Sequence, residues 1–316
     1  MRPGTRRRGD GLKPPAARGE KKTHEARGLG GRKVTIVGPG RLGQALGRLL
    51  AKAGVPIDLV VARRVSRARQ AARFIGAGTP AALDDPRLGR AGVVLLTTTD
   101  AAIEPVAKVL ATRSADWRGK VVLHTCGSLP SSVLRSLARR GAAIGSIHPF
   151  QPVPNPSTGI QTLPGCYWAI EGAAQACALG KRIVRLLKGT PFPIRPSRKV
   201  LYHASGIMVC PALLGLMSQS ERLLKLAGVP ARIARPMLAR SVGETVANFA
   251  RLGGRRALTG PATRGDWTTL RRHFAALRRA LPDVVPAYAA LVSAMLRLAG
   301  KRPPREFKKA LRNAAA

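Results

Sequence analysis

The sequence is short of acidic residues, aromatic residues and cysteines. Its 316 residues contain 15 Asp or Glu against 55 Lys or Arg, and the formal net charge is +40. The four cysteines include no C-x-x-C pair, so neither a zinc site nor a disulfide framework is indicated. We therefore expect no metal and a reducing, cytoplasmic environment.

Long apolar runs are also missing. The first apolar run begins at Val34, and no signal peptide precedes it. The most apolar later segment, residues 207–217, is too short to span a bilayer. These absences predict a soluble protein that has no membrane partner.

The large positive charge suggests nucleic-acid binding, but the residue pattern argues against it. Aromatic residues make up only 4% of the chain and are not interleaved with the basic residues. The arginines are scattered along predicted helices, and residues 1–33 carry eleven Lys or Arg against three acids. We expect solvated, arginine-rich faces without specific nucleic-acid binding, although polyanions should bind nonspecifically at low salt.

Composition along the chain predicts two domains between two tails. Residues 1–31 are rich in Gly, Pro and charge, which predicts a disordered basic tail. Residues 32–195 alternate between strand and helix patterns, residues 196–300 read as helical, and residues 301–316 form a basic tail that extends the last helix or frays. The predicted fold is α/β, a doubly wound parallel Rossmann sheet followed by an all-α helical domain.

The predicted elements follow from apolar periodicity. In the first domain they are strands at 34–37, 57–62, 93–97, 120–124 and 143–147, and helices at 41–53, 66–74, 101–111 and 130–140. The proline-rich segment 149–159 is predicted to be a linker or a lip over the site. Strands at 167–170 and 192–194, with a helix between them at 173–187, either join the sheet or form a small cap. The later helices are predicted at 199–227, 231–251, 266–280 and 284–298.

The segment KVTIVGPGRLGQALGRLLAKAG, residues 33–54, combines an apolar strand, a glycine-rich turn and an amphipathic helix. Gly38, Gly40 and Gly43 have the G-x-G-x-x-G spacing of a dinucleotide-binding turn. Gly38 should permit the tight turn, Gly40 should admit a pyrophosphate, and Gly43 should pack the helix on the strand. The alternative is a glycine-rich turn in another α/β protein. If a dinucleotide binds, its phosphates lie at the helix N-terminus, against Pro39, Arg41 and Leu42.

The residues after the second predicted strand indicate which dinucleotide binds. An acid at this point would hydrogen-bond the adenosine ribose, as in NAD-binding units. The chain has Arg63, Arg64 and Ser66 there and no acid. Two guanidinium groups and a hydroxyl suit a 2′-phosphate, so the predicted cofactor is NADP. The alternative is that both arginines belong to the general arginine excess.

Polar residues follow several other predicted strands, where the ligand of an open parallel sheet binds. Thr98, Thr99 and Asp100 follow one strand, and Cys126 follows the next, so all four are candidates for cofactor contact. Asp100 also stands where a helix N-cap is needed. His148 follows a further strand, and it either contacts the substrate or is a hydrogen-bonded structural histidine.

The order of these motifs resembles a family. VTIVGPGRLGQAL, VVLLTTTDAAI, VVLHTCGSL, GSIHPFQ, KVLYHASGI and LTGPATRGDW, between Lys33 and Arg297, are similar to bacterial proteins that join a Rossmann-like domain to a C-terminal domain of unknown function (DUF2520). Their plan resembles that of ketopantoate reductases, pyrroline-carboxylate reductases and β-hydroxyacid dehydrogenases. The resemblance implies an NADP-dependent oxidoreductase fold and a homodimer formed through the helical domain, but no particular substrate.

Two departures from these relatives concern the helix that begins near Lys199. The hydroxyacid dehydrogenases place an asparagine shortly after the matching lysine, whereas this chain has Tyr202 and His203. Further along, where the family carries Ser-Asn, it has Cys210 and Pro211, and the proline should kink the helix.

Two segments supply candidates for catalysis and substrate binding. Lys199, Tyr202, His203 and Gly206 fall at offsets of zero, three, four and seven, so they share one helix face. Lys199 and His203 are the predicted catalytic residues, and Tyr202 and His148 the predicted substrate contacts; the alternative is a solvated lysine beside packing side chains. In the later loop, Arg264 is predicted to grip an anionic substrate group and Asp266 to contact substrate or cap a helix.

These inferences predict an NADP-dependent oxidoreductase that transfers a hydride to or from a small keto, imino or hydroxy compound. The alternative is a dinucleotide-binding regulator or scaffold without catalysis, which the missing asparagine and Pro211 favour.

Overall fold

The computed structural model describes residues 29–315, so most of the predicted N-terminal tail lies outside the described residues. These residues divide into two compact units, with the division between Gly206 and Ile207. We describe each unit by itself.

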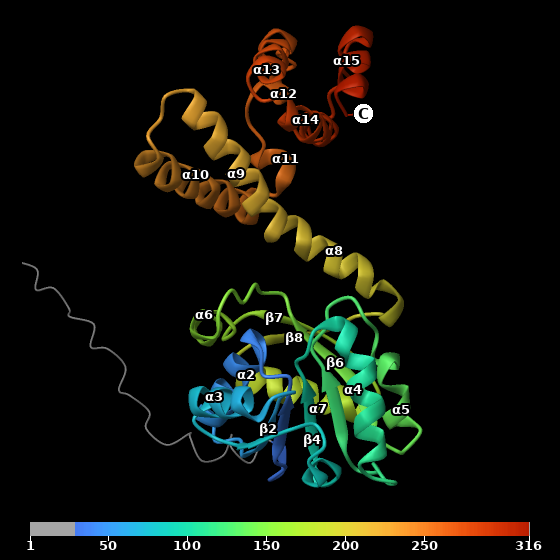
Figure 1. Ribbon diagram of the computed structural model, residues 1–316. Helices are drawn as coiled ribbons and strands as arrows, with labels where there is room; N and C mark the ends of the chain where they lie inside the picture. Colours follow the sequence, from blue (N-terminus) through green and yellow to red (C-terminus); the bar gives the residue numbers. More distant parts are fainter. Residues whose placement is uncertain (1–28, 316) are drawn as a thin grey trace, which may run out of the picture. The chain divides into compact units, whose positions relative to one another are not determined.

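One sheet organises the first unit (Figure 1). In the described residues its eight strands have the order β3-β2-β1-β4-β5-β6-β7-β8. The strands are β1 (Val34–Val37), β2 (Ile57–Val61), β3 (Thr79–Ala81), β4 (Val93–Leu96), β5 (Val121–His124), β6 (Ala143–Pro149), β7 (Tyr167–Gly172) and β8 (Thr190–Pro193).

The sheet is mostly parallel, which confirms the predicted α/β fold. Only β7 runs against its neighbour β6, with Ser146 opposite Glu171, and β8 then runs parallel to β7. The strands expected near 167–170 and 192–194 therefore extend the sheet and form no separate cap. The sequence reading missed β3, which has three residues and contains a proline, a residue that weakens a strand pattern.

Helices cover both faces of the sheet (Figure 1). They are α2 (Arg41–Lys52), α3 (Val65–Ile75), α4 (Asp100–Thr112), α5 (Arg135–Ala138), α6 (Pro156–Thr162) and α7 (Ala174–Leu186), with 3₁₀ turns η2 (Pro86–Arg90), η3 (Ser131–Leu134) and η4 (Pro196–Arg198). Side chains of α2, α3 and α7 fill one core, and those of α4 and α5 fill the other. Alternate strand residues point into opposite cores, as the pleat requires: Val93 and Leu95 into the first, Val94 and Leu96 into the second.

Two predicted segments of this unit differ from expectation. The helix expected at 130–140 is the short pair η3 and α5, and Ser131 at its start donates its backbone N–H and its hydroxyl to a buried carboxylate. The proline-rich segment contains the helix α6, which starts at Pro156 and is capped by Asn155. Proline suits the first position of a helix, where its missing N–H costs nothing.

The helix α8 (Lys199–Val209) crosses the division between the units. It ends at Val209, and the non-helical residue Cys210 separates it from α9 (Pro211–Leu226). The break confirms the kink expected from Pro211 within the predicted helix 199–227.

The second unit is helical. It contains α9, α10 (Ala231–Leu252), α11 (Gly254–Ala257), α12 (Pro261–Arg264), α13 (Trp267–Ala280), η5 (Pro282–Val284), α14 (Val285–Ala299) and α15 (Arg305–Ala315). Its core joins α12 to α15 and includes Phe274, Val292 and Phe307. Residues 305–315, expected to extend the preceding helix or fray, form a separate helix with Phe307 and Leu311 buried.

Within the described residues, two helical stretches are long and apolar enough to cross a membrane by length and composition alone: Pro196–Leu226 and Pro282–Ala299. The first stretch, which the break at Cys210 interrupts, is longer than the apolar segment expected from the sequence. None of its most apolar window is buried, against 28% of the window of the second stretch.

Candidate functional site

The glycine-rich turn lies between β1 and α2 and packs tightly on the end of β4. Gly38 has a φ of +80°, and a Cβ there would lie 2.9 Å from the backbone nitrogen of Thr98. A Cβ on Gly43 would lie 2.3 Å from Thr97 Oγ1, which donates a hydrogen bond to the carbonyl of Gly38 at 2.8 Å. Any side chain at either position would push the turn off the sheet, which agrees with the roles predicted for these two glycines.

Gly40 is different because it faces open space. A Cβ on Gly40 would meet no atom nearer than the Gly38 carbonyl at 4.0 Å. Gly40 is also the N-cap of α2, no side chain among residues 29–315 caps that helix, and its first turn has no acid. The first N–H groups of α2 and the positive end of its dipole therefore remain available to an anion.

A cleft of about 890 Å³ opens above this turn, and we call it the glycine cleft. Its polar lining consists of backbone around Gly38, Pro39 and Gly40, the hydroxyl residues Thr97, Thr98 and Thr99, and the cations Arg63, Arg64 and Arg67; its apolar walls include Leu83, Ala102 and Val106. The Thr98 hydroxyl is buried and has no hydrogen-bond partner within the described residues. The glycine cleft thus combines backbone N–H groups, hydroxyls and cations, which suit phosphate groups, with apolar walls, which suit a base or a sugar.

The glycine cleft contains only part of the predicted cofactor set. Ser66 is exposed on α3 and does not line it, whereas Arg67, which the sequence reading omitted, does. The signal for Arg67 is its position one turn after Arg64, the N-cap of α3. Arg41 donates to the carbonyl of Pro154 at 3.4 Å, and Leu42 packs against the core.

Asp100 and Cys126 also lie outside the lining of the glycine cleft. Asp100 is the first residue of α4 and Thr99 is the N-cap, so the expectation that Asp100 caps this helix is wrong. The Asp100 carboxylate accepts a hydrogen bond from Ser128 at 3.3 Å. Cys126 Sγ accepts from the backbone N–H of Ser128 and of Leu129, and burial raises the pKa of its thiol.

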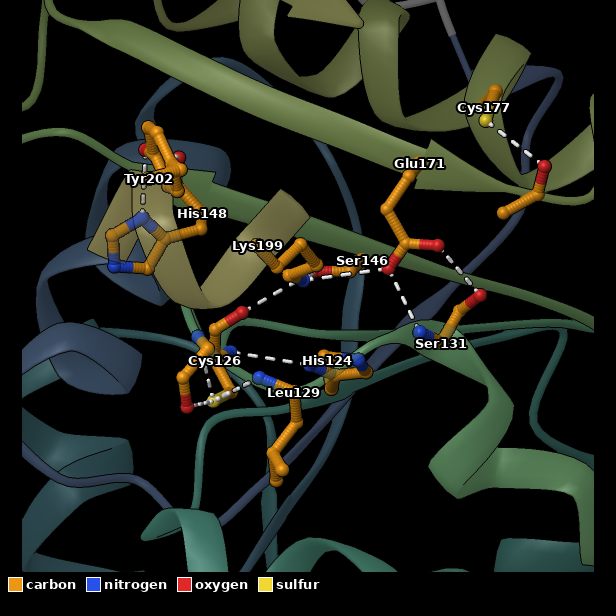
Figure 2. Close-up of polar contacts among 12 residues, drawn as sticks. His124, Cys126, Leu129, Ser131, Ser146, His148, Glu171, Cys177, Lys199 and Tyr202 are labelled. Atoms are coloured by element: carbon orange, nitrogen blue, oxygen red, sulfur yellow. Dashed lines mark hydrogen bonds and ion pairs between the residues drawn. The ribbon is translucent and has the colours of Figure 1, made fainter. Parts of the chain in front are cut away.

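A buried polar cluster lies beneath the start of α8, and Figure 2 shows its members. We call it the Lys199 cluster: Ser131, Ser146, Glu171 and Lys199. Lys199 is only 1% exposed, its Nζ donates to Ser146 Oγ, and it lies 3.3 Å from Glu171 Oε1. The Glu171 carboxylate also accepts from Ser131, at 2.8 Å from the backbone N–H and 2.7 Å from the hydroxyl. Burial lowers the pKa of Lys199, and the Glu171 carboxylate opposes that shift.

The other predicted residues of α8 face the ends of β5 and β6. Tyr202 Oη lies 2.9 Å from His148 Nδ1, and the rings of His148 and His203 have centroids 5.9 Å apart. A Cβ on Gly127 would lie 2.6 Å from His203 Cδ2 and 2.7 Å from His148 Nε2, so both imidazoles sit directly over this glycine. The structure therefore brings together three of the predicted catalytic and substrate residues.

Burial sets the protonation of this region. It lowers the pKa of His124 to about 3 and that of His148 to about 4, and in His148 the nearby His203 adds to the shift. Burial also raises the pKa of Tyr202. At neutral pH the imidazoles of His124 and His148 are therefore neutral and the Tyr202 phenol is protonated, so Tyr202 is a hydrogen-bond donor.

Arg264 and Asp266 belong to the second unit. The Asp266 carboxylate caps α13, accepting from the backbone N–H of Thr269 at 3.0 Å and from its hydroxyl at 2.7 Å. These hydrogen bonds lower the pKa of Asp266. This confirms the capping alternative for Asp266, while substrate contact by Arg264 stays a prediction.

Comparisons with known proteins agree with this architecture. Residues 20–149 match the family model described as a Rossmann-like domain, and residues 166–295 match the model described as a domain of unknown function, DUF2520. No curated protein matches the chain. The chain therefore joins a Rossmann-like domain to a DUF2520 domain, the family resemblance that its motifs indicated.

Several solved structures share the fold. A Bacteroides fragilis protein provisionally named as an NADP oxidoreductase matches with a TM-score of 0.67 and 20% identity, over 85% of this chain and 99% of that one. A Streptomyces aurantiacus imine reductase matches with a TM-score of 0.57 and 18% identity, over 90% of this chain and 96% of that one. A Coxiella burnetii pyrroline-5-carboxylate reductase matches at 0.54 and 14% identity, over 84% and 97%. At these identities the likeness shows the fold alone.

Proposed function

We propose that the protein is an NADP-dependent oxidoreductase that transfers a hydride to or from a small keto, imino or hydroxy compound. The observation that carries the proposal is the glycine cleft, in which an open glycine at an uncapped helix N-terminus lies together with three cleft-lining arginines. The similarity in fold to reductases of imines and of pyrroline-5-carboxylate supports the reaction class.

The proposal assigns both phosphate groups of the cofactor to residues of the glycine cleft. The α2 N-terminus and Gly40 would hold the pyrophosphate, and the unpartnered Thr98 hydroxyl would give it a further donor. Arg63, Arg64 and Arg67 would hold the 2′-phosphate, because planar guanidinium groups bind phosphate oxygens in pairs. NADPH would supply the hydride, and the protein supplies binding, orientation and proton delivery.

The residues proposed to meet the substrate are Tyr202, His148 and His203. A carbonyl or imine that accepts a hydride needs a nearby proton donor. Tyr202 is protonated at neutral pH and touches His148, so a proton that leaves its hydroxyl can be replaced through the imidazole. Lys199 is not assigned this role, because its ammonium is buried among Ser146 and Glu171.

Turnover with a panel of small carbonyl and imine compounds tests the proposal, followed as loss of the reduced nicotinamide absorbance. We expect NADPH consumption with at least one class of compound, and a loss of roughly 100-fold or more in Tyr202→Phe. Arg69→Ala, on the exposed side of α3, serves as the control and should keep full activity.

The alternative function is a non-catalytic, dinucleotide-binding regulator or scaffold. The burial of Lys199 favours it. This lysine matches the one in the hydroxyacid dehydrogenases, but here it is buried in an ion pair with Glu171. Tight NADPH binding without turnover across the whole panel would support this alternative and contradict the oxidoreductase.

We also propose that a second copy of the chain covers α9 and α10. In the described chain α9 has no buried residue and α10 has only Ala234, while Leu214 is 68% exposed and Phe249 63% exposed. Large apolar side chains in such number mark an interface. Light scattering should give the mass of a dimer, and Leu214→Asp with Phe249→Asp should give a monomer. Recruitment of the protein to lipid vesicles without dimer formation would contradict the proposal.

A further inference from the structure

The Lys199 cluster contains an ion pair, Lys199 and Glu171, that is buried in the protein interior. Lysine and glutamate are seldom fully buried, and each loses several kcal/mol of hydration unless its partners compensate. The side chains of Lys199 and Glu171 are 1% and 2% exposed. Every oxygen of the Glu171 carboxylate accepts a hydrogen bond, and the ammonium of Lys199 has two acceptors. Each of the two charged groups therefore has several hydrogen-bond partners, so removing either side chain should disturb more than one contact.

The Lys199 cluster ties together elements that are distant in sequence. Glu171 lies on β7, directly opposite Ser146 on β6, and Ser131 belongs to η3. The Ser146 hydroxyl also donates to the carbonyl of Cys126 at 3.4 Å, in the loop after β5. Lys199 is the first residue of α8. The lysine therefore fastens α8 to the two strands and the loop that form the floor of the substrate region.

The next two turns of α8 make contacts that depend on where Lys199 fixes the start of the helix. Tyr202 reaches His148, His203 lies over Gly127, and a Cβ on Gly206 would meet the Phe150 ring at 3.3 Å. With Lys199, these residues occupy one face of the helix, since they recur at offsets of three, four and seven. The close approach of His203 to Gly127 leaves no room for even a methyl group between α8 and the loop.

We propose that Lys199 and Glu171 are positioning residues: their buried ion pair sets α8 so that Tyr202 and His203 meet the loop after β5. Lys199 acts through these residues and does not itself touch the substrate. The inference rests on the proposed function for its kinetic consequence, but the docking of α8 can be measured without cofactor or substrate.

The test is hydrogen exchange of the α8 amides in the full-length protein, with the ultraviolet titration of Tyr202 as a second readout. In Lys199→Met we expect the amides of residues 202–206 to exchange on the order of 100-fold faster. The pKa of Tyr202 should fall towards that of a free tyrosine, because its phenol loses its burial. Lys181→Met, which removes an exposed lysine from α7, controls for the change in net charge and should leave both readouts unchanged.

The double variant Lys199→Met with Glu171→Leu separates positioning from chemistry. It leaves no buried charge, so it carries the test even if the single variant fails to fold. A positioning role predicts that α8 protection recovers at least in part, and that kcat recovers with it while the affinity for NADPH stays constant throughout. If Lys199→Met leaves α8 exchange and the Tyr202 titration unchanged, or if the double variant regains protection but no turnover, the proposal is overturned. Absence of NADPH binding in the parent protein would refute the proposed function and leave the exchange result to judge the positioning role.

Discussion

The glycine cleft and the Lys199 cluster lie in the same unit, but they differ in the exposure and the hydrogen bonding of their polar groups. In the glycine cleft the cations are exposed, the helix N-terminus is uncapped and the Thr98 hydroxyl lacks a partner within the described residues. In the Lys199 cluster each charged group is buried and paired. The unpaired polar groups of the glycine cleft can bind a ligand, whereas the paired groups of the Lys199 cluster stabilise the fold. Substitutions in the first region should therefore change binding, and those in the second should change stability.

The largest effect is expected for Glu171→Leu. The substitution leaves the Lys199 ammonium buried without its counter-ion and the Ser131 N–H without its acceptor, and breaking a buried pair from one side costs about 3–5 kcal/mol. Urea unfolding should show this loss. Glu104→Leu is the control, because Glu104 pairs with Lys108 at the surface and its loss should cost less than about 1 kcal/mol. Equal losses in the two variants would contradict a structural role for the buried pair.

Gly40→Val should show the opposite behaviour. The backbone at Gly40 is extended, with φ −74° and ψ −160°, and a Cβ would meet no described atom nearer than 4.0 Å, so a side chain would project into the opening at the α2 N-terminus. We expect the free energy of unfolding to change by less than about 1 kcal/mol, while NADPH affinity falls roughly 100-fold, or about 3 kcal/mol. Gly40→Ala should give a smaller loss of the same kind. Undiminished NADPH binding by the valine variant would rule out this phosphate site.

Arg64→Ala should reduce NADPH affinity by about 10-fold to 30-fold, or about 2 kcal/mol, because one charge-assisted contact to the 2′-phosphate is lost. The affinity for NADH, which lacks that phosphate, should stay the same. Calorimetric titration of both cofactors measures the difference, and Arg69→Ala on the same helix is the matched control. A parallel loss of affinity for both cofactors would show that Arg64 does not select between them.

The smallest effect concerns pH. The pKa of His148 is lowered to about 4 by burial and by His203, so between pH 6 and pH 5 the unfolded chain binds a proton at this position and the folded chain does not. The free energy of unfolding should therefore decrease as the pH is lowered from 6 to 5, by about 1 kcal/mol for this histidine. Urea unfolding of His148→Gln should show a correspondingly shallower dependence. An unchanged slope would mean that His148 is protonated in the folded protein.

The sequence predicted the glycine cleft far better than the Lys199 cluster, and the reason is distance along the chain. Gly38, Gly40 and Gly43 form one local motif, and Arg63 and Arg64 follow directly on a strand that the apolar pattern marks. Arg67 lies one turn further along, inside α3, where the residues after the strand no longer point to it. These residues meet within one β-α-β unit, so their spacing carries the geometry.

The Lys199 cluster depends on a register that no local pattern specifies. Ser146 and Glu171 face each other because β7 runs antiparallel to β6, and the sequence pattern allows this strand either a place in the sheet or a place in a cap. Without that pairing no pattern gives Glu171 a neighbour, and the helical spacing alone predicts that Lys199 is open to substrate. The helical spacing of Tyr202, His203 and Gly206 did predict the docked face, because that feature belongs to a single helix.

The measurement that tests the central claim most directly is the titration of the full-length protein with NADPH and with NADH at moderate salt. If the glycine cleft is an NADP site, NADPH should bind at least about 10-fold more tightly than NADH, Arg64→Ala should remove most of that difference, and Gly40→Val should weaken the binding of both cofactors. Equal affinities, or no binding of either cofactor, would contradict it.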